Sequence, residues 1–196
     1  MNKTLRSFVY LIIFTILIGM FVYLGKKDYG NKKSDAELFS MEYPEISTDN
    51  MFKYIDVIHL LDLINNGEDA IILIGFSSNE WMQKYVKYVF PVFKEHNLST
   101  VYYYDVQEDR SKGTKYFKQL EEILSEYLKV TDQGVEYLFT PALVFIKDGE
   151  IMYFDDETAL TSYNTSPNIY WSEEKVNDFQ QRIAYYLEMD GFSEQV

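Results

Sequence analysis

The sequence predicts an α/β domain in which helices flank a mixed central sheet, preceded by a single N-terminal transmembrane helix. Patterns typical of strands and helices alternate through the body of the chain and end in a hairpin and a helix. Residues 70–76, AIILIGF, form a continuous apolar run, which indicates a strand buried on both faces. Residues 8–24 form a second apolar run without any charge, and its length suits a membrane span.

Residues 1–25 are predicted to be an uncleaved membrane anchor. The uncharged run FVYLIIFTILIGMFVYL extends from Phe8 to Leu24. With one flanking residue on each side, a helix of this length reaches about 28 Å, close to the roughly 30 Å of a bilayer's hydrocarbon core. Tyr10 and Tyr23 lie near its two ends, where aromatic rings prefer the membrane interface. No small-x-small cleavage site follows the run, which favours an anchor over a signal peptide.

Charges around this run favour a body outside the cytoplasm. Lys3 and Arg6 precede it, and a short basic tail is typical of an anchor with a cytoplasmic N-terminus. Four lysines that follow the run argue for the opposite orientation, so the charge pattern is equivocal. Residues 26–50 are polar and lack periodicity, which predicts a flexible tether to a domain over residues 51–196. The predicted location is the cell membrane, with a single pass.

Composition excludes two classes of function. The chain has no cysteine, so its own residues cannot perform thiol–disulfide chemistry. Its formal net charge is −13, and the body is more acidic than the whole because six of the 18 basic residues precede residue 34. Such a surface repels nucleic acid, and we expect no nucleic-acid partner. Aromatic residues make up 17% of the chain, which suits a groove or a partner surface.

The first part of the body predicts a strand, a helix and a buried strand. Residues 51–55 alternate in polarity, as an edge strand does. Asp56 is a helix-capping residue, and apolar residues recur at helical spacing from Val57 to Ile64. The continuous apolar run at 70–76 then predicts the centre of the sheet.

The middle of the body continues the alternation. Residues 80–96 have helical content with Pro91 inside, and residues 100–106 are rich in branched and aromatic side chains, as a central strand is. Residues 115–129 carry one apolar and one acidic face, which predicts an amphipathic helix.

The last part predicts a hairpin and a helix. Residues 142–146 and 151–154 read as its two strands, joined by a Lys-Asp-Gly-Glu turn. Ser172 is placed to cap a final helix whose first turn carries two glutamates. Between them, residues 158–171 form a long polar and aromatic loop, and loops of this length are often functional.

The junction between the strand at 70–76 and the helix after it carries a family resemblance. It reads Gly75-Phe76-Ser77-Ser78-Asn79-Glu80-Trp81-Met82. It resembles the junction of Gram-positive thioredoxin-like proteins, including bacteriocin transport accessory proteins, which reads roughly Gly-Phe-Pro-x-Cys-Pro-Trp-Cys. Gly75, Phe76 and Trp81 match, whereas Asn79 and Met82 occupy the two cysteine positions. A competing register puts Met82 and Tyr85 there, and neither register restores a thiol.

A second segment, Phe139-Thr140-Pro141-Ala142 followed by LVFIKDG, is similar to the family's segment around a cis-proline. The resemblance implies that the Thr140–Pro141 peptide is cis and that Thr140 faces the site. It covers roughly residues 51–190 and implies a thioredoxin-like fold. One departure is visible, because about four more residues separate Met82 from Pro91 than the family pattern has.

The resemblance, without its cysteines, implies a redox-inactive, membrane-anchored accessory or protein-binding module, linked to bacteriocin or peptide export or to another cell-surface process. The candidate groove for a peptide or protein partner comprises Trp81, Thr140 and Pro141, because the family binds extended chains through the residue before the cis-proline. A vestigial site kept for stability is an equal alternative. Further alternatives are a thiol–disulfide oxidoreductase that uses a partner's cysteines and a structural subunit of a membrane complex.

No other pattern predicts catalysis or a metal site. His59 and His96 fall in different predicted helices, so no convergent set of ligands or positioned base is indicated. The acidic run at 155–157 lacks the alternating spacing of a calcium loop and predicts a solvated turn. The loop at 158–171 is a second candidate interaction surface. We therefore expect no catalytic residue, no metal and no cofactor.

Overall fold

The structure, a computed structural model, describes residues 13–20, 33–159, 161 and 164–192. The chain divides into two compact units, Met1–Ser34 and Asp35–Val196. In the first, residues 13–20 are helical. Within the described residues, no helix is long and apolar enough to cross a membrane. Much of the run at 8–24 lies outside those residues, so the transmembrane helix stays a prediction.

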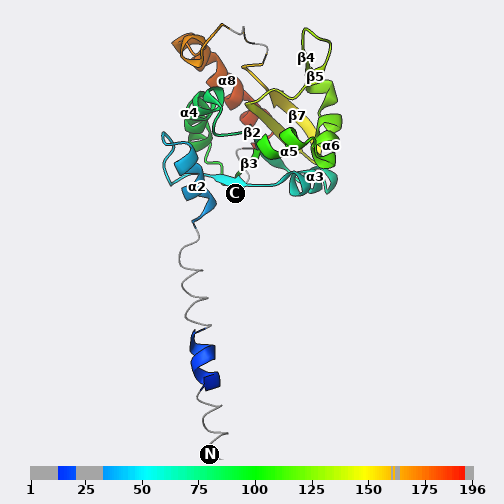
Figure 1. The fold of residues 1–196 in the computed structure, drawn as a ribbon. Coiled ribbons are helices and arrows are strands. Elements are labelled where there is room, and N and C mark those ends of the chain that lie inside the picture. The colour runs from blue at the N-terminus through cyan, green and yellow to red at the C-terminus, as the bar shows by residue number, and fades with distance from the viewer. Residues whose placement is uncertain (1–12, 21–32, 160, 162–163, 193–196) are drawn as a thin grey trace, which may run out of the picture. The chain divides into compact units, whose positions relative to one another are not determined.

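The second unit is built on a mixed five-stranded sheet with the strand order β1-β3-β2-β6-β7 (Figure 1). The first three of these strands are parallel to one another, and the last two continue the sheet in antiparallel fashion. Every residue of the central strand β2 is buried, as its continuous apolar run predicts. The α/β class with a mixed sheet is therefore confirmed. The strands are β1 (Phe52–Tyr54), β2 (Ala70–Gly75), β3 (Val101–Asp105), β6 (Ala142–Lys147) and β7 (Glu150–Asp155).

Helices cover both faces of this sheet, and alternate residues of each strand feed two separate cores. In β2, Ile71 and Leu73 face one core, whereas Ile72 and Ile74 face the other. The first core is completed by α2 (Asp35–Glu42), α4 (Glu80–Glu95) and α8 (Glu173–Met189). The second is completed by α3 (Val57–Asn65) and α6 (Lys115–Ile123).

Three helices begin directly after a capping residue, and two of these residues, Asp56 and Ser172, are predicted from the sequence. The Asp56 carboxylate accepts from the backbone N–H groups of the first turn of α3, at 2.9 and 3.0 Å. Asn79 caps α4, and Ser172 caps α8. Each cap satisfies donors that the first turn of a helix leaves without a partner.

The predicted flexible tether at 26–50 is wrong for its second half. Residues 35–42 form α2, and Phe39 is fully buried there, with its ring 3.9 Å from that of Phe52. Tyr43 follows the helix and donates its hydroxyl to that of Tyr103 at 2.9 Å. The folded domain therefore begins at residue 35 instead of 51, because apolar aromatic side chains from this segment complete the first core. Residues 26–32 lie outside the described part of the chain.

The same segment seals the outer edge of the sheet. β1 is an edge strand, and its N–H groups at Phe52 and Tyr54 point away from β3. Phe52 N donates to Asn50 Oδ1 and Tyr54 N donates to Asp35 Oδ2, both at 3.1 Å. An unpaired strand edge invites pairing with another chain. Here the side chains of Asn50 and Asp35 accept hydrogen bonds from the outward N–H groups of β1.

Short elements complete the fold and modify two predictions. The predicted helix at 115–129 ends at Ile123 and gives way to a 3-10 turn, η1 (Ser125–Tyr127). The loop at 158–171 contains a one-turn helix, α7 (Pro167–Tyr170). The sequence patterns did not indicate α5 (Gln107–Lys112) or the small hairpin of β4 (Lys129–Val130) and β5 (Glu136–Tyr137).

The buried aromatic of α2 supplies a stability test. We expect Phe39→Ala to lower the free energy of unfolding by about 3–5 kcal/mol, the usual cost of deleting a fully buried Phe side chain. Leu38→Ala, on the same helix but 39% exposed, is the matched control and should change it by far less. Urea denaturation of both variants measures the difference. An unchanged midpoint for Phe39→Ala would contradict the packing of α2.

Candidate functional site

The two positions matched to cysteines in the family resemblance lie at the start of α4, where β2 ends. Met82 is fully buried and lies over Gly75. A Cβ atom added to Gly75 would stand 2.4 Å from Met82 Sδ, far inside van der Waals contact. The thioether therefore fills the space above the glycine, as a flexible apolar side chain does in an irregular gap.

Asn79 connects the start of α4 to the proline loop. Its side-chain oxygen accepts from Trp81 N at 2.9 Å, which caps the helix. Its Nδ2 donates to the backbone oxygen of Thr140 at 3.2 Å. The Thr140–Pro141 peptide is cis, as the resemblance implies. The structure thus brings together two of the predicted site residues, Asn79 and Thr140, which lie 61 positions apart in the chain.

Arg110, on α5, holds the same loop from the other side. Its guanidinium donates to Leu138 O at 2.7 Å and to Thr140 Oγ1 at 3.3 Å. It also lies over the ring of Tyr137, 5.2 Å from the centroid. Burial lowers the pKa of Arg110, although the group stays charged at physiological pH. No sequence pattern indicated a role for Arg110, because the short helix that carries it was not predicted.

Trp81 remains partly exposed, whereas Pro141 is buried. The Trp81 ring meets that of Tyr170 edge-on, with 5.5 Å between the ring centroids. Tyr170 belongs to α7, so the loop predicted as a second interaction surface adjoins the predicted groove. An aromatic pair of this geometry stabilises by about 0.5–1.5 kcal/mol beyond its buried area.

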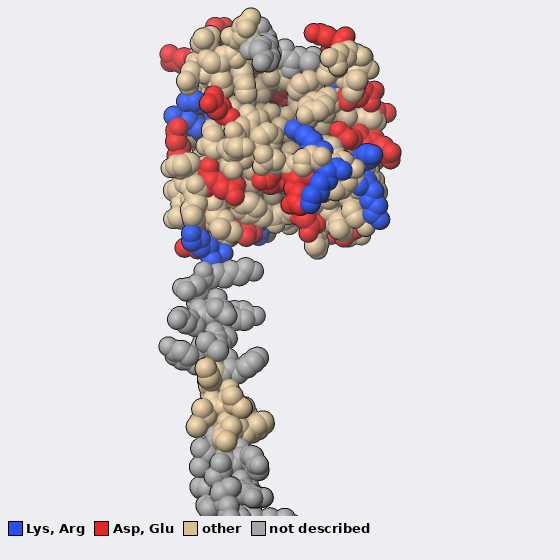
Figure 2. Space-filling model, viewed as in Figure 1, with Lys and Arg blue, Asp and Glu red and all other residues tan. Residues whose placement is uncertain are grey.

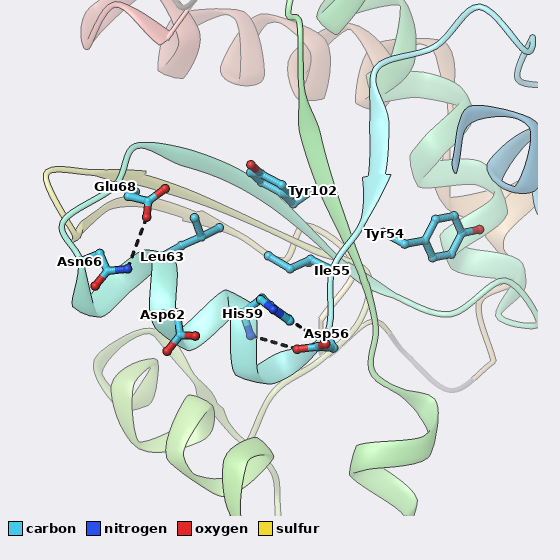
Figure 3. A pocket seen from close by; sticks show the side chains of 9 residues that line it. All are labelled: Tyr54, Ile55, Asp56, His59, Asp62, Leu63, Asn66, Glu68 and Tyr102. Atoms are coloured by element: carbon cyan, nitrogen blue, oxygen red, sulfur yellow. Dashed lines mark hydrogen bonds and ion pairs between the residues drawn. The ribbon is translucent and has the colours of Figure 1, made fainter. Parts of the chain in front are cut away.

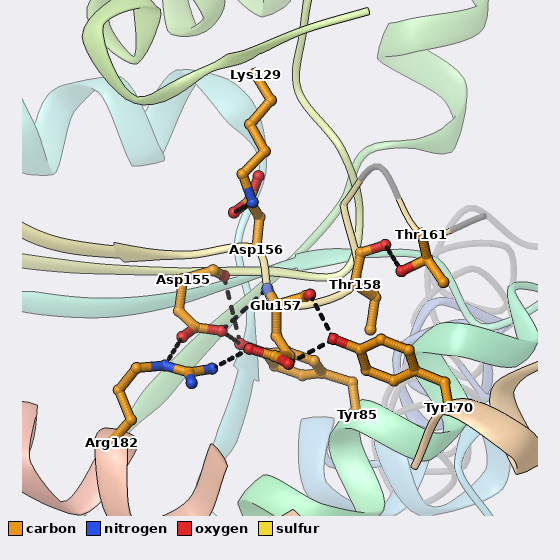
Figure 4. Close-up of polar contacts among 9 residues, drawn as sticks. All are labelled: Tyr85, Lys129, Asp155, Asp156, Glu157, Thr158, Thr161, Tyr170 and Arg182. Atoms are coloured by element: carbon orange, nitrogen blue, oxygen red, sulfur yellow. Dashed lines mark hydrogen bonds and ion pairs between the residues drawn. The ribbon is translucent and has the colours of Figure 1, made fainter. Parts of the chain in front are cut away.

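A network of charged side chains anchors the hydroxyl of Tyr170 (Figure 4). Arg182 of α8 donates to Asp155 and to Glu157, each at 2.6 Å. Tyr85 of α4 donates to Asp155 Oδ1 at 2.9 Å, and burial raises its pKa well above the usual value. Tyr170 donates to the backbone oxygen of Glu157 at 3.0 Å. The network joins α4, α7, α8 and the end of β7.

The predicted solvated turn at 155–157 is therefore wrong. Asp155 and Asp156 are both buried, and successive residues of a strand point to opposite faces. Asp155 turns toward Arg182, while Asp156 pairs with Lys129 Nζ at 2.6 Å on the other side (Figure 4). The acidic run looked solvated because its cationic partners lie 25–27 residues away in sequence.

The groups that meet at this site are an amide, a guanidinium, a hydroxyl and aromatic rings. A chain without cysteine has no thiolate to attack a disulfide. Among the described residues, no group of three or more His, Asp or Glu side chains is placed to hold a metal ion. What the site presents is a half-buried tryptophan and a threonine held in place by Asn79 and Arg110.

Comparison with known proteins assigns no family. No protein-family model matches the chain, and no curated protein matches its sequence. The thioredoxin-like resemblance therefore stays a prediction beyond the α/β class, and the function is inferred from the site's own geometry.

The two neighbouring aspartates should respond oppositely to substitution. Asp155→Asn removes the charged acceptor of Tyr85 and one of the two carboxylates that pair with Arg182, so we expect a loss of about 2–3 kcal/mol of unfolding free energy at neutral pH. Burial raises the pKa of Asp156. Stability from such a group falls as pH rises through the raised pKa, because the folded state holds the proton more tightly. Asp156→Asn should therefore leave stability at pH 7 unchanged or higher. Urea titrations of both variants from pH 4 to pH 8 measure their free energies of unfolding. Equal losses of stability in the two variants would contradict the different roles given to Asp155 and Asp156.

Proposed function

We propose that this chain is a redox-inactive, thioredoxin-like binding module that an N-terminal helix anchors to a membrane. It holds an extended peptide or a segment of a partner protein against Trp81, Thr140 and Pro141. The body lies outside the cytoplasm, and export of bacteriocins or other peptides is the process that the family resemblance suggests. No cofactor takes part.

The observation that carries this proposal is the hydrogen bond between Asn79 and Thr140. In the family resemblance, Asn79 stands at the reactive cysteine position. Here its amide caps α4 and donates to the proline loop, two tasks that maintain the geometry of the site without redox chemistry. Met82 then fills the second position with a buried thioether. In this proposal, the side chains of Asn79 and Met82 maintain the geometry of the site at the two positions where the family has cysteines.

The loop retains a capacity for backbone recognition. A carbonyl oxygen has two lone pairs, and Asn79 uses one of those on Thr140. The second can accept from the N–H of an incoming extended chain, as in strand addition. Trp81 and Tyr170 supply an aromatic surface beside it, and such residues dominate the energetics of many interfaces.

Membrane attachment in this proposal rests on the apolar run at 8–24 and its flanking charges. Its seventeen residues reach nearly across a hydrocarbon core. Attachment would confine the module to two dimensions and raise its effective concentration toward a partner in the same membrane.

The groove is tested by truncating its tryptophan. Trp81→Ala should weaken binding of a fluorescently labelled, unfolded and cysteine-blocked polypeptide by about tenfold, the effect of removing an aromatic anchor from an interface. Its melting temperature should change little because Trp81 is partly exposed. Tyr185→Ala, which removes an exposed aromatic from α8, is the control and should bind normally. Fluorescence anisotropy measures the affinities. Lost stability with unchanged binding would support a vestigial site.

Restoring the sulfurs tests the register. Asn79 is extended, with φ −87° and ψ 116°, so a cysteine there can approach one in the first turn of α4. We expect Asn79→Cys/Met82→Cys to form a disulfide, seen by mass after alkylation, and to catalyse the reduction of insulin by dithiothreitol, which returns the two cysteines to thiols. Met82→Cys/Tyr85→Cys is the control: its positions lie within the helix, where Cβ atoms three residues apart are about 5–6 Å apart, too far for a disulfide. The parent should show no turnover; real turnover by it would overturn the proposal.

A further inference from the structure

A hollow of about 630 Å³ lies between α3 and the β1–β3 side of the sheet, outside the predicted groove (Figure 3). Its size falls within the range of ligand-binding clefts in proteins. The side chains of Ile55, Leu63 and Tyr102 are half-buried and form an apolar floor. Tyr54 lines one end through its backbone side, since its ring turns away to meet Tyr103 edge-on.

The hollow lies beside β1, an edge strand of only three residues. On one face of the sheet, α2 covers this short edge strand. On the other face, the helices of the second core are α3 and α6, and Tyr102 of β3 remains partly exposed beside them. Apolar side chains at the hollow therefore keep some contact with solvent, which a ligand would remove.

Acidic side chains surround this floor. Asp56, Asp62 and Glu68 line the hollow, and no lysine or arginine of the described part of the chain does. Asp56 is engaged by His59 Nδ1 at 2.9 Å, while Glu68 receives only a long contact from Asn66 at 3.4 Å. Asp62 and Glu68 are exposed and project toward solvent. A ligand that complements this lining carries positive charge around an apolar group.

Among the described residues, no lysine or arginine forms an ion pair with Asp56, Asp62 or Glu68. Lys53 is the closest basic residue along β1, and its ammonium donates to Thr100 Oγ1 at 2.7 Å. On the face shown in Figure 2, most basic side chains gather near α5 and α6, and acidic ones are spread across the domain. Complementary charge steers association and selects partners.

The backbone donors at the outer edge of β1 already have partners. The outward N–H groups of β1 are taken by the side chains of Asn50 and Asp35. An occupant must therefore bind by its side chains, and its affinity must depend on salt.

From this combination we infer that the hollow binds a short basic segment of a partner protein, in which lysine or arginine residues flank one apolar side chain. The apolar side chain rests on Leu63 and Tyr102, and the flanking cations meet Asp62 and Glu68. The site is independent of Trp81.

The test uses the full-length chain and the labelled peptide Lys-Lys-Leu-Lys-Lys. The proposal requires that it bind, that Lys-Lys-Ser-Lys-Lys bind more weakly, and that Glu-Glu-Leu-Glu-Glu not bind. Asp62→Asn/Glu68→Gln should weaken binding of the first peptide by about fivefold, because exposed ion pairs each contribute modestly. Added salt should reduce the affinity of the parent toward that of this variant.

A matched variant separates this site from general attraction to an acidic protein. Asp178→Asn/Glu126→Gln removes the same charge from exposed positions on α8 and η1 and should bind as the parent does. Trp81→Ala should also bind normally. The inference is overturned if the matched variant loses as much affinity as Asp62→Asn/Glu68→Gln, if the serine peptide binds as well as the leucine peptide, or if no basic peptide binds.

Discussion

The need to bury the sheet on both faces governs the rest of this fold. Every residue of β2 is inaccessible, and its alternate side chains enter different cores. Neither core can form without helices on its own side. On one side α4 reaches the edge strand, where the rings of Phe93 and Phe52 lie 6.3 Å apart between centroids, and α2 completes the cover through Phe39. On the other side α3 and α6 leave the edge partly open. The same constraint thus explains both the ordered segment before β1 and the hollow behind it.

Local patterns predicted the elements well because their signals lie within a few residues. The apolar run of β2, the cap Asp56 and the cap Ser172 all act on neighbours in sequence. α2 escaped prediction because Phe39 is the only residue within the helix that is buried, so no periodic stripe marks it. What it packs against, β1 and β3, follows later in the chain.

The site was only partly predictable for the same reason. Asn79 and Thr140 were singled out through a family resemblance, and the structure adds the hydrogen bond between them. Arg110 and Tyr170 come from elements too short to show a pattern. The prediction of a solvated turn at 155–157 was wrong because no local pattern indicates that Arg182 pairs with this acidic run. A buried charge is costly without its counter-charge, and only the tertiary structure shows which residue supplies that counter-charge.

Sealing the edge of β1 has a consequence for how these molecules coexist. A chain that is 17% aromatic and contains wholly buried strands carries an inherent tendency to aggregate, and exposed strand edges are where such growth begins. Asn50 and Asp35 accept from the N–H groups of that edge, so these donors are not available to a strand from another molecule. Two hydrogen bonds at one margin of the sheet thus leave the N–H groups of Phe52 and Tyr54 without capacity to pair with a strand of a second molecule.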